Sequence, residues 1–204
     1  MSQPLQIRRN PALGPDEHRR RSEFYAERVT GWDTKDREAF EALVAAMPLR
    51  GRQLVAPPLA GGADWPVLIR WGRELPFNNL VVRRMSANEY HRNSAELWAD
   101  SMARTDEGVG STLRIETGFA LSDDGLWREH TWVRDMSGGG EGTLIETTQA
   151  RVAYWGIALT QQGSWVFAAE QLGYAPVPET ADDRTRGKPR TGGHADRAHA
   201  RSRG

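Results

Sequence analysis

The sequence contains no cysteine in its 204 residues. This absence excludes disulfide bonds, thiolate metal ligands, iron–sulfur clusters and any thiol nucleophile. The chain also lacks an excess of either charge, with 27 basic and 27 acidic residues, so no overall field steers it toward nucleic acid or a membrane. No stretch approaches the ~20 apolar residues of a membrane span, and residues 1–21 lack the apolar core of a secretory signal peptide. We therefore expect a cytoplasmic protein that does not contact a membrane.

The two ends of the chain differ in composition from its middle. Residues 176–204 contain many arginines and almost no apolar side chains, so they cannot bury enough surface to offset the entropy of ordering. We interpret them as a disordered, mildly basic tail and residues 1–14 as a flexible N-terminus, which leaves one domain over residues 15–175. The spacing of His194 and His199 does not form a metal site, and we expect no cofactor.

The first half of the domain is predicted to be mainly helical. Residues 15–29 begin with Pro15 and end before Gly31, which is the usual arrangement at helix ends. A second helix is predicted from about Asp36 to Met47, because its apolar residues recur at i, i+3, i+4 and i+7. A proline- and glycine-rich loop over 56–64 and a short apolar strand over 67–71 follow.

The second half changes to the rhythm of a sheet. A capping-box pattern predicts that a helix begins at Ser86 and continues toward Gly108. Alternating or apolar runs separated by turn residues then predict four strands, followed by a short helix, at residues 113–121, 127–135, 143–147, 151–159 and 164–172. The expected fold is α+β, with N-terminal helices and one further helix packed on an antiparallel sheet.

Three residues of this second half have complementary chemistry. A group at the start of a helix, such as Tyr90, lies where the helix dipole favours an anion. His130 on a strand can serve as a base, and Glu146 on the next strand can hydrogen-bond the histidine and fix its tautomer. A glycine-rich turn over 137–142 separates the two strands, so a symmetric hairpin would make His130 and Glu146 cross-strand neighbours. Leu144 alternates onto the same face as Glu146, which predicts a partly buried carboxylate that needs a partner.

The same region resembles the core of the transglutaminase-like superfamily of papain-like folds. Cores of that superfamily carry a cysteine at a helix start, then Gly-Tyr, His-Ala-Trp-Val and Ile-Asp-Pro-Thr segments. The corresponding segments over residues 86–156 are Tyr90-His91-Arg92-Asn93-Ser94, Gly118-Phe119, His130-Thr131-Trp132-Val133 and Ile145-Glu146-Thr147-Thr148. The resemblance implies a papain-like core in which Tyr90, His130 and Glu146 occupy the catalytic positions.

The departure from that pattern is at the nucleophile. Tyr90 stands where the superfamily has cysteine, and a phenol with a pKa of about 10 is a poor nucleophile at neutral pH. The resemblance therefore implies the fold and pocket more firmly than the activity. Our leading hypothesis is a catalytically inactive binding or regulatory protein whose partner presents a peptide or a side-chain amide. In such a protein, Tyr90 fills the space of the absent nucleophile or donates a hydrogen bond to a bound carbonyl.

Two alternatives from other functional classes stay open. The first is a hydrolase or acyl-transferase that uses Tyr90, Ser94 or a water activated by His130 and Glu146. The second is a nucleic-acid-associated protein that uses the arginine-rich tail, although acidic residues dilute its charge and no aromatic side chain is interleaved for base stacking. Asn93, Ser94 and Trp132 are the candidates for substrate contacts, and His91 and Arg92 are expected to be solvated residues of the helix.

Overall fold

The computed structural model describes residues 27–49, 52–57, 64–104 and 111–174, together with positions 16 and 20. Positions 16, 20 and 27–30 are helical, in agreement with the first predicted helix, whose remaining residues lie outside the described part. The predicted flexible N-terminus and basic tail also lie outside it.

Helix α2 (Thr34–Ala46) forms as its sequence predicts. The side chain of Asp33 accepts a 2.8 Å hydrogen bond from the Asp36 N–H, which caps the first turn. Phe40 and Leu43 are buried, and the helix ends just before Pro48.

The strand predicted over residues 67–71 is wrong, because this segment forms helix α3 (Trp65–Trp71). Pro66 lies in the first turn, where its missing N–H costs no hydrogen bond. Trp65 and Leu68, three residues apart, are the buried side chains, whereas Trp71 is exposed. A short apolar run is compatible with a strand or a helix, and here packing against α2 decides between them.

In the described part of the chain, seven strands form one mixed sheet with the order β2-β7-β4-β5-β6-β3, and β1 pairs with β5. The strands are β1 (Gln53–Leu54), β2 (Arg73–Glu74), β3 (Leu80–Val82), β4 (Leu113–Leu121), β5 (Leu126–Asp135), β6 (Thr143–Glu146) and β7 (Ala153–Ala158). The prediction of a purely antiparallel sheet is wrong, since β1–β5 and β3–β6 are parallel pairs. The two strands that pair in parallel, β1 and β3, have two and three residues and come from the first half of the domain. No sequence pattern predicts them.

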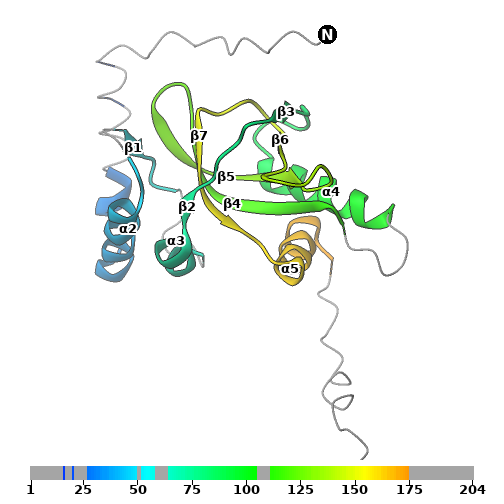
Figure 1. Cartoon of the computed structure of the whole chain (residues 1–204). Helices are drawn as coiled ribbons and strands as arrows, with labels where there is room; N and C mark the ends of the chain where they lie inside the picture. Colours follow the sequence, from blue (N-terminus) through cyan, green and yellow to red (C-terminus); the bar gives the residue numbers. More distant parts are fainter. Residues whose placement is uncertain are drawn as a thin grey trace, which may run out of the picture.

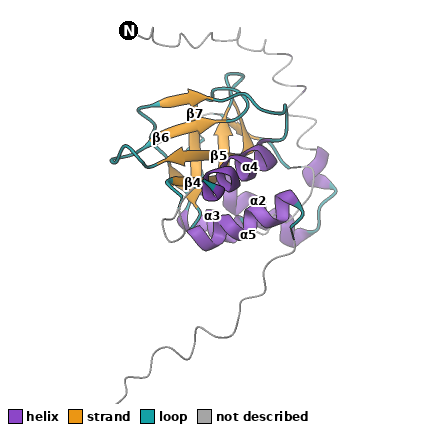
Figure 2. Cartoon of the chain, turned by 90° about the vertical axis from the view of Figure 1, so that its right-hand side faces the viewer, coloured by secondary structure: helices purple, strands orange, loops and turns teal. Residues whose placement is uncertain are grey.

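The helices gather on one side of the sheet, as Figure 2 shows. Helices α4 (Tyr90–Ala103) and α5 (Gln161–Leu172) pack together near one end of β4, and α2 and α3 lie near its other end (Figure 1). Ile115 of β4 packs with Ala95, Trp98 and Ala168, and Phe119 belongs to the cluster of Phe40, Leu43 and Trp65. Odd-numbered residues of β4 therefore face the helical layer.

The opposite face of the sheet holds a buried ion pair that the sequence analysis missed. Glu116 is fully buried and accepts hydrogen bonds from Trp132 Nε1 at 2.7 Å and from Arg134 Nε at 2.8 Å. Arg134 Nη1 donates to the carbonyls of Pro76 and Glu141. The pair thus ties β4 and β5 to the segment before β3 and to the glycine-rich turn. Because β4 is covered on both faces, alternation along it does not separate buried from exposed residues.

Candidate functional site

Helix α4 begins four residues later than the capping-box pattern predicted. The cap residue is Glu89, which makes no side-chain capping bond, and the helix ends at Ala103. Asn88 has a φ of 62°, so the chain turns sharply after Ser86, and the Ser86 carbonyl instead accepts a 2.7 Å bond from Asn93 Nδ2. The predicted start at Ser86 is therefore wrong, and Tyr90 is the first residue of the helix.

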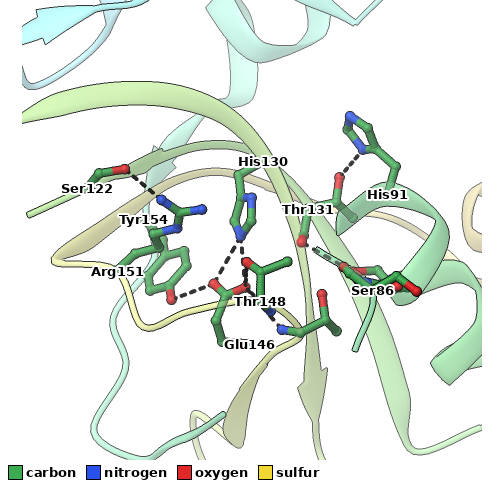
Figure 3. Close-up of polar contacts among 12 residues, drawn as sticks. Ser86, His91, Ser122, His130, Thr131, Glu146, Thr148, Arg151 and Tyr154 are labelled. Carbon is green, nitrogen blue, oxygen red and sulfur yellow. Dashed lines mark hydrogen bonds and ion pairs between the residues drawn. The ribbon is translucent and has the colours of Figure 1, made fainter. Parts of the chain in front are cut away.

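The predicted contact between His130 and Glu146 is present (Figure 3). His130 Nε2 lies 2.9 Å from Glu146 Oε1 and 3.0 Å from Oε2, and both side chains are buried. The β5–β6 register pairs Val133 with Ile145, so the two residues contact each other diagonally rather than directly across the hairpin. Nε2 donates to the carboxylate, which fixes the tautomer and leaves Nδ1 as the nitrogen that is not bound to Glu146.

The Glu146 carboxylate is the centre of a group of donors. Besides His130, it accepts hydrogen bonds from the Tyr154 hydroxyl at 2.9 Å, the Thr147 N–H at 3.0 Å and the Thr148 hydroxyl at 3.1 Å (Figure 3). Burial raises the pKa of Glu146, but the bonds and charge of His130 and the Tyr154 bond outweigh burial and hold this pKa below its ordinary value. Burial and the adjacent Glu146 raise the pKa of Tyr154, so its hydroxyl stays a donor.

Tyr90 lies against the imidazole of His130. Their ring centroids are 4.7 Å apart, and the Tyr90 ring also lies 4.4 Å from that of His91. Burial and the charge of Glu129 raise the pKa of Tyr90, and Arg151 opposes them only in part. The phenol therefore remains protonated at neutral pH, which is the opposite of what an activated nucleophile needs.

The expectation that His91 and Arg92 are solvated is wrong for His91 and correct for Arg92. His91 Nδ1 lies 2.7 Å from the Thr131 hydroxyl, and the ring packs near Phe167. Burial lowers the pKa of His91 to about 4, with a smaller contribution from the charge of His130. Arg92 is exposed and pairs with Glu96 one turn later. The helical spacing carries this signal, because the buried residues Ala95 and Trp98 follow His91 at i+4 and i+7 on the same face.

We expect stability to fall as the pH drops from about 6.5 to about 4, because the unfolded chain then binds a proton that folded His91 resists. A folded pKa below the unfolded value means that this contribution is complete above pH 6.5 and is lost toward pH 4. In His91→Asn, the free energy of unfolding should fall by ~2 kcal/mol less than in wild type as the pH drops from 7 to 4. Urea unfolding of both proteins between pH 4 and 7 measures the difference, and parallel curves would contradict this assignment.

The three candidates for substrate contacts are buried and bonded within the protein. Asn93 binds the Ser86 carbonyl, Ser94 Oγ donates to the Thr131 carbonyl at 3.2 Å, and Trp132 Nε1 donates to Glu116. None of the three lines the pocket beside Tyr90. The Ser94 contact holds α4 against β5, the Asn93 contact holds the turn before α4, and the Trp132 contact joins β5 to β4.

A pocket of about 490 Å³ opens where α4 begins. Its wall comes from the turn before α4, the first half of β5 and the loop between β6 and β7. The lining residues are Arg84, Met85, Ala87, Asn88, Tyr90, Arg128, Glu129, Thr148, Gln149 and Arg151. Tyr90 therefore contacts His130 on its inner side and the pocket on its outer side.

Strand β5 has an open edge in this pocket. On the side away from β4, it pairs with β1 at Leu126–Trp127 and with β6 from Val133 onward, and no described strand pairs with it between these points. The Trp127 carbonyl accepts from the Val55 N–H at 2.8 Å, and the Thr131 carbonyl accepts from Ser94 Oγ, both on this edge. Because main-chain groups alternate along a strand, the N–H and C=O of Glu129 point to the same edge, where no described group bonds them. Sequence patterns carry no signal for such an edge.

No known protein family, curated protein or solved structure matches the chain. Within the described ranges, no group of three or more acidic or histidine side chains is arranged to hold a metal ion. None of the described helices combines the length and the apolar character needed to cross a bilayer.

Proposed function

We propose that the chain is a catalytically inactive binding protein with a transglutaminase-like core, which holds an extended peptide by an amide at the open edge of β5. The peptide lies in the pocket beside Tyr90. One of its amides bonds Glu129, in the gap between the pairing of β5 with β1 and its pairing with β6. The expected partner is a cytoplasmic protein.

The observation that carries this proposal is the pair of main-chain groups of Glu129. An N–H and a C=O on the same side of one residue match the C=O and N–H of an amide, as in the addition of a peptide strand to a sheet edge. Both groups lie between two points at which the same edge already binds partners, Trp127 and Thr131. A bound peptide therefore needs to occupy only the stretch of the β5 edge between Trp127 and Thr131, where Glu129 is open.

The chemistry around His130 favours binding over catalysis. Glu146 is occupied by internal donors, and His130 is only 1% exposed. Tyr90, the residue at the nucleophile position, is held protonated by burial and by Glu129. The His130–Glu146 pair then has a positioning role, because the imidazole that Glu146 holds packs against the ring of Tyr90.

The His130–Glu146 pair also keeps a hydrolase or acyl-transferase as the second candidate. In that case a bound peptide would be cleaved or acylated, and the reaction would require Glu146. The binding proposal expects peptides to be recovered chemically unchanged, so mass spectrometry of bound peptides separates the two candidates.

A random decapeptide display library selected on the full chain tests the proposal. We expect enriched peptides whose binding is lost in Ala87→Trp, because Ala87 is exposed and lines the pocket, which the indole would fill. The matched control is Ala45→Trp, an exposed position on α2. Peptides that bind wild type and Ala87→Trp equally, or a library that yields no binder, would overturn the proposal.

A further inference from the structure

The wall of the pocket carries three guanidinium groups, those of Arg84, Arg128 and Arg151. They differ in whether a carboxylate pairs with them. Arg128 is paired with Asp124, with Nη2–Oδ2 at 2.6 Å and Nη1–Oδ1 at 2.9 Å. Arg84 is exposed and forms no ion pair with any described residue. Arg84 and Arg151 therefore form no ion pair with a described acidic residue, although the charge of Arg151 acts on the buried carboxylate of Glu146.

Arg151 is held in place but incompletely bonded. Its Nη1 donates to the Ser122 hydroxyl at 2.6 Å, which anchors the guanidinium (Figure 3). Its Nε is buried and has no hydrogen-bond partner among the described residues. A buried donor without a partner is costly. Because Nη1 is anchored and Nε is buried, Nη2 is the nitrogen of Arg151 that is left to bind an oxyanion from the pocket.

The pocket also holds an acidic side chain, and both it and Arg151 act on the Tyr90 phenol, with opposite effects on its pKa. Glu129 is the one carboxylate among the described lining residues, and its charge acts on the Tyr90 phenol. The N-terminus of α4, which also opens here, has no side-chain cap, so its partial positive charge adds to that of the arginines. Three arginines thus line the pocket against one carboxylate, and Arg84 and Arg151, which form no ion pair with a described residue, favour negative charge beside them.

We infer that the bound peptide carries an oxyanion, the carboxylate of an acidic residue or the phosphate of a phosphorylated one, which Arg84 and Arg151 hold together while β5 binds the main chain. This inference rests on the proposed function, since the peptide amide at Glu129 sets where the side chain can reach. The planar guanidinium groups bind either oxyanion through paired hydrogen bonds.

The test uses peptides enriched on the full chain and their matched derivatives. We expect the enriched sequences to contain Asp or Glu, and replacement of that residue by the corresponding amide to weaken binding about tenfold or more. Phosphoserine at the same position shows which oxyanion the pocket prefers, and tighter or equal binding of either form supports the inference.

The protein variants are Arg84→Gln and Arg151→Gln, with Arg83→Gln as the control. Arg83 is the exposed neighbour of Arg84, it lines a different pocket, and its replacement changes the net charge equally. Each test variant should weaken binding of the acidic peptide about tenfold, and the control should change it less than twofold. Arg84→Gln removes no described contact, so this variant remains informative if Arg151→Gln is destabilised.

Two outcomes would overturn the inference in distinguishable ways. If amide and acidic peptides bind alike, and Arg84→Gln binds as wild type while Ala87→Trp does not, the oxyanion site is wrong and peptide binding stands. If no peptide binds to the wild-type chain, the proposed function fails together with the inference.

Discussion

A cysteine introduced by Tyr90→Cys should have a thiol pKa well below the ordinary value. The new thiol would lie at the first residue of α4, next to the ring of His130, whose Nε2 is held by Glu146. A helix start and an adjacent histidine both stabilise a thiolate. The sulfur of the shorter side chain would lie closer to the helix start than the phenol oxygen, whose pKa is raised by burial and Glu129, so we expect the stabilising effects to prevail. We expect the iodoacetamide rate at pH 6 to exceed that of an ordinary thiol about tenfold, since the larger thiolate fraction outweighs the lower nucleophilicity.

The control for this experiment is Thr34→Cys. Thr34 is the exposed first residue of α2, so it has the same position in a helix but is not among the ring neighbours of His130. The natural chain has no cysteine, and each variant therefore contains a single thiol. If the pH midpoints of alkylation of the two variants coincide, Tyr90 does not occupy a nucleophile-like position, and the resemblance to a transglutaminase-like core loses its main support.

Replacing Glu146→Gln should destabilise the fold by about 3 kcal/mol. Every described partner of the carboxylate donates a hydrogen bond, including His130, Tyr154 and Thr148. An amide offers one acceptor oxygen and turns its NH₂ toward the remaining donors, so at least one buried donor is left without a partner. Chemical denaturation at pH 7 measures the loss.

The pH dependence gives a second readout of Glu146. Its folded pKa lies below the ordinary value of 4.5, so its contribution is present above that pH and is lost as the pH falls through the folded pKa. Glu146→Gln should therefore remove part of the acid sensitivity below pH 4.5. The control Glu170→Gln, on the exposed face of α5, should change stability by less than ~0.5 kcal/mol. Equal stability of the two variants would show that the Glu146 network does not hold the site.

The elements that the sequence predicted well are those with strong local signals. Strands β4 to β7 agree with the predicted ranges within two residues at each end, because turn residues separate them. Helix α5 begins at Gln161, three residues before the predicted start, and ends as predicted before Gly173, which adopts the left-handed conformation expected of a glycine there. The predictions for α3 and for the start of α4 are wrong. Packing against α2 determines that residues 65–71 are helical, and the positive φ at Asn88 delays the start of α4.

The candidate site was predictable only where it depends on complementary side chains. His130 and Glu146 were paired from their chemistry and spacing, and the structure shows the contact although the register is diagonal. The open edge at Glu129 is bounded at one end by β1, a two-residue strand from the first half that pairs in parallel with β5. Local patterns do not encode such pairings, so the pocket could only be found in three dimensions.

The most direct test of peptide binding at this edge is an amide ¹H–¹⁵N NMR titration of the full chain with an enriched acidic peptide. We predict that the largest shift changes occur at Glu129 and in the segments that line the pocket, residues 84–90 and 148–151. The Glu129 amide should also become protected from hydrogen exchange, because its N–H would then be bonded to the peptide. Shift changes confined to other surfaces, with an unprotected Glu129 amide at saturation, would contradict the account.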